Sequence, residues 1–500
     1  SRRHHQAEGE VAISSLQAYH GKLNVSIDLR DKPGKILDNG QIYIQAANID
    51  MKPWLGQWVR ESTGIDNADF SLSSWIEINE GEAESIFLNL AHGQVYWRTK
   101  AQSHQIQFDN QRVKLAKRAG GWRLDAPRLR LISDGKAWPE SSRLSLFWQP
   151  EAKGQEEILR IRASQMQLDD LTPTLPIFTF LSPEKISPWL SLNPSGELSI
   201  FALDLPLAAP EQFDVLAKWK EISWDQWQGL PSIEHLNGLM IGNLRNGHFD
   251  LSVTDSLSYY EGMFKAPLEI TNAQSRVFWK KQDERWTLWT DGVDIQAKSL
   301  WINGDMSFSY AKDDGPWLSI LAGINLTDAG DAWRYYPEEL MGEELIYYLT
   351  NAIEGGRARD ATLIFEGNPT HFPYRDHDGK FQVFVPLKDA TLQFQPTWQP
   401  LTELSINLDF INNGLWMISD NAKLGKLDSH RIEASIPAYQ DNELLLDAEI
   451  KGQGQDIYDY LKNSPLSDSV AAALEQVQIT GDVAGRLSLQ IPFTNEEIVE

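Results

Sequence analysis

Short segments in which every second residue is apolar recur along nearly the whole chain. Examples are Leu23–Leu29 (LNVSIDL), Leu404–Phe410 (LSINLDF) and Glu443–Ile450 (ELLLDAEI). Side chains of a β-strand point alternately to opposite faces, so each of these segments has one apolar face and one polar face. A chain built from many such strands has a large continuous apolar surface, and its function depends on what that surface contacts.

The composition narrows the classes of function. The chain has 500 residues with 45 Lys and Arg against 70 Asp and Glu, a formal net charge of -25. This balance argues against a nucleic-acid partner, whose phosphates require basic surface. There are no cysteines, which excludes disulfides, thiol nucleophiles and cysteine-ligated metals, and which suits an oxidising compartment.

The apolar runs are too short for a membrane helix, which needs about 20 residues. The longest are Leu175–Leu181 and Leu318–Leu326. The first residues carry no signal peptide, and position 1 is not Met. We therefore expect a section of a longer protein, with any membrane anchor outside it.

The breaks between segments are soft and carry no Ser/Gly linker. We expect a first β-groove segment at 1–150, strands with a Pro-rich crossing and a short helix at 151–232, a β-groove repeat at 233–330 and a second repeat at 331–500. Short helices are expected after Pro53 (with Trp54, Leu55, Trp58 and Val59 as an apolar stripe), at 210–219, and at 337–353 as a cap that Gly355–Gly356 ends. The segment 171–193 contains four prolines and predicts an irregular crossing.

Two stretches repeat one pattern. Glu261–Ala273 (EGMFKAPLEITNA) and Asp378–Ala390 (DGKFQVFVPLKDA) both run from an acidic residue and glycine through an apolar strand with Pro-Leu to Asn/Asp-Ala. Proline inside a strand indicates an edge or a bulge. Bulges that recur at matching places curve a sheet, so the repeat predicts a curved sheet with one apolar face.

Signs of catalysis are scarce. The sequence has no nucleophile elbow, phosphate-binding loop or zinc-protease motif. His371, Asp376, His377 and Asp378 contain metal-ligand types, but the downstream carboxylate of a calcium loop is missing, and a solvated turn is the simpler interpretation. Paired carboxylates for glycoside hydrolysis stay open, because their spacing is spatial. We predict no catalytic residue, metal or cofactor.

One basic island stands out from the acidic background. It could attract anionic head groups, although a solvated strand face explains it as well. Its members are Arg112, Lys114, Lys117, Arg118, Arg123, Arg128 and Arg130.

Long stretches of the last third resemble the YhdP family of AsmA-like proteins of the Gram-negative envelope. They are 332–369 (AWRYYPEELMGEELIYYLTNAIEGGRARDATLIFEGNP), 384–417 (FVPLKDATLQFQPTWQPLTELSINLDFINNGLWM) and 450–492. The rest of the chain resembles the family more diffusely. The resemblance implies a bridge-like lipid transfer protein that is anchored in the inner membrane. Its β structure would cross the periplasm, carry phospholipid acyl chains in a hydrophobic groove toward the outer membrane, and contain no catalytic residues.

Pattern and resemblance together predict a mainly β fold: an elongated, strongly curved antiparallel sheet that forms a U-shaped hydrophobic groove of stacked repeats, with a few short helices. Two alternatives stay open, a carbohydrate-binding or glycan-acting β-helix that uses its many Trp residues, and a structural scaffold whose apolar faces meet in a closed core. The interpretations can be separated by whether the apolar strand faces line an open groove or pack against a second sheet. The predicted groove-lining residues are Leu198, Ile200, Leu363, Phe365, Phe381, Val383, Val385, Leu404, Ile406, Leu408, Leu444, Leu446, Ala448 and Ile450.

Overall fold

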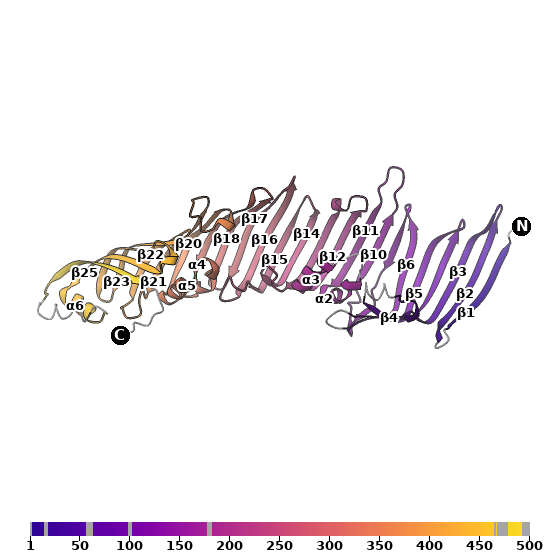
Figure 1. The fold of residues 1–500 in the computed structure, drawn as a ribbon, viewed down its shortest axis with the longest axis horizontal. Helices are drawn as coiled ribbons and strands as arrows, with labels where there is room; N and C mark the ends of the chain where they lie inside the picture. Colours follow the sequence, from indigo (N-terminus) through magenta and orange to yellow (C-terminus); the bar gives the residue numbers. More distant parts are fainter. Residues whose placement is uncertain are drawn as a thin grey trace. The chain divides into compact units, whose positions relative to one another are not determined.

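The structure is a computed structural model that describes residues 3–14, 19–56, 64–98, 103–177, 183–464, 467 and 479–492. In this part of the chain, 26 strands join into one open antiparallel sheet, accompanied by a few short helices (Figure 1). The expected fold class, a mainly β protein with an open antiparallel sheet, is confirmed. No helix in the described ranges is both long enough and apolar enough to cross a membrane.

The chain divides into two compact units, residues Ser1–Trp227 with His235–Phe249, and Gln228–Glu234 with Asp250–Glu500. Strands β14 (Ser232–Asn243) and β15 (Asn246–Tyr259) contribute residues to both. The other elements of the first unit are β1 (His4–Ser14), β2 (Tyr19–Lys32), β3 (Lys35–Asp50), η1 (Lys52–Trp54), β4 (Ile65–Asn79), β5 (Glu82–Arg98), β6 (Ser103–Arg118), β7 (Gly121–Ala126), β8 (Leu131–Ser133), β9 (Lys136–Ala137), β10 (Arg143–Gln149), β11 (Ile158–Gln167), α2 (Leu168–Leu171), η2 (Thr172–Ile177), α3 (Pro183–Leu192), β12 (Ser195–Pro206), η3 (Pro210–Gln212) and β13 (Asp214–Trp224).

The second unit holds the stretches that resemble the YhdP family most strongly. Its elements are β16 (Leu268–Gln282), β17 (Arg285–Ala297), β18 (Leu300–Ala311), β19 (Gly315–Leu326), η4 (Ala329–Tyr335), α4 (Glu338–Met341), α5 (Glu343–Ala352), β20 (Ile353–Gly367), η5 (Pro369–His371), β21 (Lys380–Leu392), β22 (Leu401–Ile411), β23 (Gly414–Leu424), β24 (Leu427–Ile436), η6 (Tyr439–Asp441), β25 (Glu443–Gln453), α6 (Gly454–Lys462) and β26 (Asp482–Pro492). From β16 to β26 each strand pairs with the next one along the chain.

The strands of the second unit are interrupted by bulges at a recurring spacing. In β20, Ala358 and Ala361 are both buried although they lie three positions apart, and Leu387 and Ala390 repeat this in β21. Residues three apart in a regular strand face opposite sides, so an extra residue must intervene. Non-glycine residues with positive φ supply it in four strands: Asp360, Asp389, Glu403 and Arg431. Because a bulge bends its strand and increases its twist, these interruptions curve the sheet.

The Pro-Leu repeat is only partly regular in the structure. In the second copy, Pro386 lies inside β21 opposite Asn407, and the register shifts between Leu387 and Ala390, as the repeat predicts. In the first copy, Pro267 lies just before β16, which begins at Leu268. The register of that strand against β17 shifts after Ile270 and again after Ser275.

The helix predictions had mixed outcomes. The helix expected at 337–353 is present as α4 and α5, which Gly342 separates with a φ of 81°. The expected stop is wrong: α5 ends at Ala352, and both glycines lie inside β20. The helix expected at 210–219 is also wrong, because only η3 is helical there. Residues 214–219 belong to β13, which pairs with β12 instead. At the first expected helix, only η1 is described and Trp58 and Val59 lie outside the described residues.

The crossing segment contains more helix than its four prolines predict. The described parts of it are η2 and the ten-residue helix α3, which accommodates Pro188. Leu171 at the end of α2 packs against a small core of the first unit formed by Ala126, Leu129, Trp138 and Met166.

Candidate functional site: an apolar sheet face

One face of the sheet in the second unit is apolar from strand to strand. Cross-strand partners lie on the same face of a sheet. Ala322 of β19 pairs with Leu363 of β20, which pairs with Val383 of β21. Val383 in turn pairs with Phe410 of β22, and Phe410 pairs with Leu415 of β23. A parallel row runs through Val385, Leu408, Met417, Ala434, Leu446 and Leu489 to β26.

The first part of this face is open. Along β18, β19 and the adjoining halves of β20 and β21, most of its apolar side chains are only half-buried, whereas Ala322 is 5% exposed. They include Ile302, Met306, Ile320, Leu363, Phe365, Phe381 and Val383. No second sheet covers them, because the described strands all belong to the one open sheet. Phe365 and Phe381 at the end of this part contact the rings of Tyr374 and Phe372 from the turn before β21. We call this the open section.

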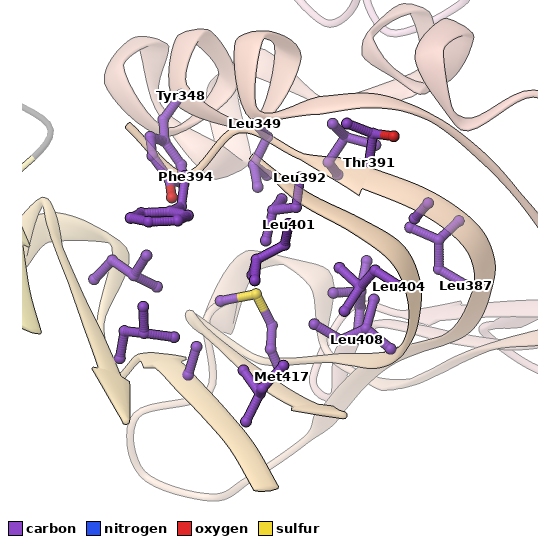
Figure 2. A pocket seen from close by; sticks show the side chains of 17 residues that line it. Tyr348, Leu349, Leu387, Thr391, Leu392, Phe394, Leu401, Leu404, Leu408 and Met417 are labelled. Atoms are coloured by element: carbon purple, nitrogen blue, oxygen red, sulfur yellow. The ribbon is translucent and has the colours of Figure 1, made fainter. Parts of the chain in front are cut away.

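The second part of the face, over β22–β25, is covered. Leu404, Ile406, Leu408, Leu444 and Leu446 are each less than 10% exposed. Figure 2 shows why: Tyr348 and Leu349 of α5 lie above, Phe394 and Leu392 lie beside them, and Leu404, Leu408 and Met417 of the strands lie below. The space left between these side chains is a cavity of about 20 Å³. We call this the covered section.

Three elements make the cover. The first is α5, whose Leu345 and Leu349 are 1% and 3% exposed. The second is the connection 393–400 between β21 and β22, in which Phe394 packs on Trp398 with ring centroids 5.6 Å apart. The third element is α6, whose Tyr460 ring has its centroid 6.0 Å from that of Trp398. All five residues belong to one core with the strands.

Burial raises the pKa of tyrosine hydroxyls in the covered section. It raises the pKa of Tyr348 and of Tyr460 far above the ordinary value, because the ionised form would lose its hydration. The covered section therefore has the character of an apolar core.

The structure brings most of the predicted groove residues onto this one face. Leu404, Ile406, Leu408, Leu444, Leu446 and Ala448 are buried under the cover. Leu363, Phe365, Phe381, Val383, Val385 and Ile450 are half-buried. Whether any of them touches lipid stays a prediction.

Leu198 and Ile200 belong to the first unit and do not share a face with each other. Leu198 packs against the small core near Met166, whereas Ile200 is 47% exposed. The register of β12 against β13 shifts between them, so that Leu198 pairs with Trp219 and Ile200 pairs with Lys218. The bulge at Ser199 sends Ile200 to the polar side, and simple alternation cannot reveal it.

Comparison with known proteins identifies the family. A model of the YhdP protein family matches residues 1–500. The intermembrane phospholipid transporter YhdP of Escherichia coli (strain K12) is 41% identical over 500 residues, which is 99% of this chain and 39% of that protein. The chain belongs to the YhdP family. It spans about two fifths of the length of that relative, and no solved structure matched it.

The polar cluster that could have held a metal is a turn in this member of the YhdP family. The His371 ring Nδ1 lies 2.5 Å from a carboxylate oxygen of Asp378, and the His377 amide donates to the Tyr374 carbonyl oxygen at 3.0 Å. Tyr374 packs against Phe365 and Phe372. Among the described residues, no group of three or more His, Asp and Glu side chains is placed to hold a metal ion.

The basic island lies on strands β6 and β7 and on the loop that follows. Several of its charges are already paired: Lys117 with Glu82 at 2.7 Å, and Arg123 with Asp125 at 2.9 Å. The Lys114 ammonium lies 4.7 Å from the centre of the Phe87 ring. These contacts are typical of a solvated strand face, and attraction of anionic head groups stays a prediction.

Proposed function

We propose that this chain is a periplasmic section of an inner-membrane-anchored conduit that moves phospholipids between the inner and outer membranes. In this proposal the apolar face carries acyl chains, and transport supports the barrier function of the outer membrane. The observation that carries it is the apolar row that continues unbroken across β18–β21 without a covering sheet. The E. coli relative is named a phospholipid transporter, and its name agrees with this cargo.

The physical reason is the cost of moving acyl chains through water. Each CH₂ group that leaves water gains about 0.8 kcal/mol, so a two-chain lipid needs a continuous apolar surface along its whole path. Ile302, Ile320 and Phe365 offer such a surface, and head groups would stay hydrated at its edge. A path without strong polar contacts has few sites that trap the lipid, and such a conduit requires no catalytic group.

The placement in the envelope is part of the same proposal. The absence of cysteine suits the oxidising periplasm. Contact with the inner membrane would come from an anchor outside this chain, and contact with the outer membrane would come from the far end of the longer protein.

Lipid analysis tests the cargo. The chain would be purified from a Gram-negative host and extracted with organic solvent, and the extract would be analysed by mass spectrometry. We expect phospholipids with weak head-group preference, since only the tails are held. An extract without lipid, or one tightly held sugar, would contradict the proposal; the sugar would favour the carbohydrate-binding interpretation instead.

A matched pair of variants tests the face. Ile320 lies on the apolar face between Met306 and Phe365, whereas its neighbour Leu321 points to the other side and is 63% exposed. Ile320→Asp should reduce bound phospholipid and, in the full-length protein, weaken the outer-membrane barrier. Leu321→Asp should do neither. Equal loss in both variants would contradict the assignment of the face.

A further inference from the structure

The covered section conflicts with the passage of lipid as the structure stands. A cavity that binds benzene has a volume of about 150 Å³, and the space between α5 and the strands is about 20 Å³. This hollow is lined by Tyr348 and Leu349 from above and by Leu404 and Leu446 from the sheet. An acyl chain that follows the open section therefore meets a filled core at β22.

Helix α5, one of the three covering elements, can leave without breaking the sheet. Strands β20–β25 are hydrogen-bonded to one another in an unbroken series. Helix α5 adds no strand to this series, and it contacts the sheet through the side chains of Leu345 and Leu349. Part of its surface faces water, because Tyr347 is 55% exposed and Glu343 and Glu344 are exposed, whereas Ile346 is fully buried.

We propose that Glu338–Ala352, helices α4 and α5, form a lid that closes the groove over β22–β25 and swings away when lipid passes. This inference rests on the proposed function. It adds a closed state to the conduit and identifies the element that opens it.

The two ends of the lid are attached differently. At its C-terminal end, α5 continues directly into β20, and the amide of Gln393 donates to the carbonyl oxygen of Ala352 at 2.7 Å. At its N-terminal end, α4 is held by a backbone bond from the Glu338 amide to the Met263 carbonyl oxygen (2.8 Å), by a long ion pair from Lys265 to Glu338 (3.7 Å) and by packing of Met341 on the core. The lid is joined here to η4 rather than to a strand, so in this proposal the N-terminal end is the one that lifts.

The natural absence of cysteine allows this end to be locked. The double variant Met263→Cys/Glu338→Cys places two thiols on adjacent backbones, a separation suited to a disulfide. The full-length protein would be studied in isolated cell envelopes that contain phosphatidylethanolamine with a diazirine in one acyl chain. After illumination, lipid adducts are mapped by mass spectrometry, and closure of the disulfide is verified in the same digest.

In the reduced double variant we expect adducts both in 302–326 of the open section and in 401–450 of the covered section. Oxidation should lower the adducts in 401–450 by about tenfold or more, since the closed state is then held, and leave those in 302–326 unchanged. Reductant should restore them. The control Lys423→Cys/Asp428→Cys joins two paired residues of the β23–β24 hairpin in the covered section and should change nothing on oxidation.

Two results would overturn the lid. Adducts in 401–450 that persist after oxidation would mean that lipid passes with α4 held down. Adducts confined to 302–326 in both states would mean that the covered section is permanent core. Absence of adducts from both regions would instead refute the proposed function itself, and the lid with it.

Discussion

The difference between the open and covered sections predicts that an Ile→Asp substitution destabilises the fold strongly in the covered section and only mildly in the open section. Ile406 is 3% exposed and lies in the core beneath the cover, whereas Ile320 is half-buried on the open face. Ile406→Asp loses the burial of an aliphatic side chain, about 1.5–3 kcal/mol. It also places a carboxylate in apolar surroundings, which costs several kcal/mol more. A total on the order of 5 kcal/mol rivals the whole stability of an ordinary domain.

At Ile320 the carboxylate reaches water, so the loss of stability should be about 1–2 kcal/mol. The assay is hydrogen exchange with and without urea, followed in peptides from 401–450. We expect Ile406→Asp to expose these peptides and Ile320→Asp to leave them protected. The loss in Ile406→Asp should shrink at low pH, because burial raises the pKa of the new carboxyl and the neutral form is cheaper to bury.

The control for both is Asn407→Asp, since Asn407 is exposed and neighbours Ile406 on the opposite face. It should behave like the unmodified chain. If Ile406→Asp were as protected as Ile320→Asp, the covered section would be wettable, and the argument that it is a closed core would fail.

Three further substitutions test individual contacts. Trp398→Ala removes a 6%-exposed ring from the cover and should cost about 3–5 kcal/mol in urea unfolding; a loss below 1 kcal/mol would show that the connection packs loosely. Tyr374→Phe deletes a buried hydroxyl without a hydrogen-bond partner among the described residues and should raise the free energy of unfolding by about 1 kcal/mol, whereas a loss would reveal a partner. Burial raises the pKa of Asp170 beside Lys136, so the folded state binds its proton more tightly than the unfolded state and this group's contribution to stability falls as pH rises above about 4. Asp170→Asn should therefore raise the melting temperature at pH 7 more than at about pH 3, and an equal shift at both pH values would contradict the raised pKa.

The strand pattern predicted the mainly β architecture because the alternation within each strand shows which of its faces is apolar. Leu404, Ile406 and Leu408 alternate in the sequence and lie on one buried face. Local alternation was sufficient for such strands, since their register to the next strand follows from short connections.

The Pro-Leu repeat predicted the bulge between Leu387 and Ala390, but a more general signal of bulges was missed. Pairs such as Ala358/Ala361 and Leu401/Leu404 place two buried residues three positions apart with polar residues between them. This spacing breaks the alternation at a matching place in several strands, and it is a stronger signal of curvature than the Pro-Leu repeat. The bulge between Leu198 and Ile200 in β12 has no such signal, because Leu198-Ser199-Ile200 alternates through it.

The cover could not be derived from the sequence, because its contacts join residues that are distant along the chain. The sequence predicted a helix at 337–353 as a cap, and in the structure Leu345 and Leu349 lie on the buried side of α5. An amphipathic helix must bury that side, but nothing in the pattern says which surface it covers. The burial of Phe394 and Trp398 was harder still to predict, because they lie in the connection between β21 and β22, which has no hydrophobic periodicity.

The same apolar face is therefore exposed in one part of the second unit and buried in another. The difference lies in the elements that cover the face, not in the strands that form it. Val383 and Leu408 lie on one apolar face, yet the first is half-buried and the second is 6% exposed. A face that evolved only as core would be covered along its whole length, because exposed apolar side chains gain nothing from facing water. A face that only carried lipid would need no helix packed into it. The proposed lid accounts for this combination, and lipid labelling on either side of the boundary between β21 and β22 should distinguish a closable section from permanent core.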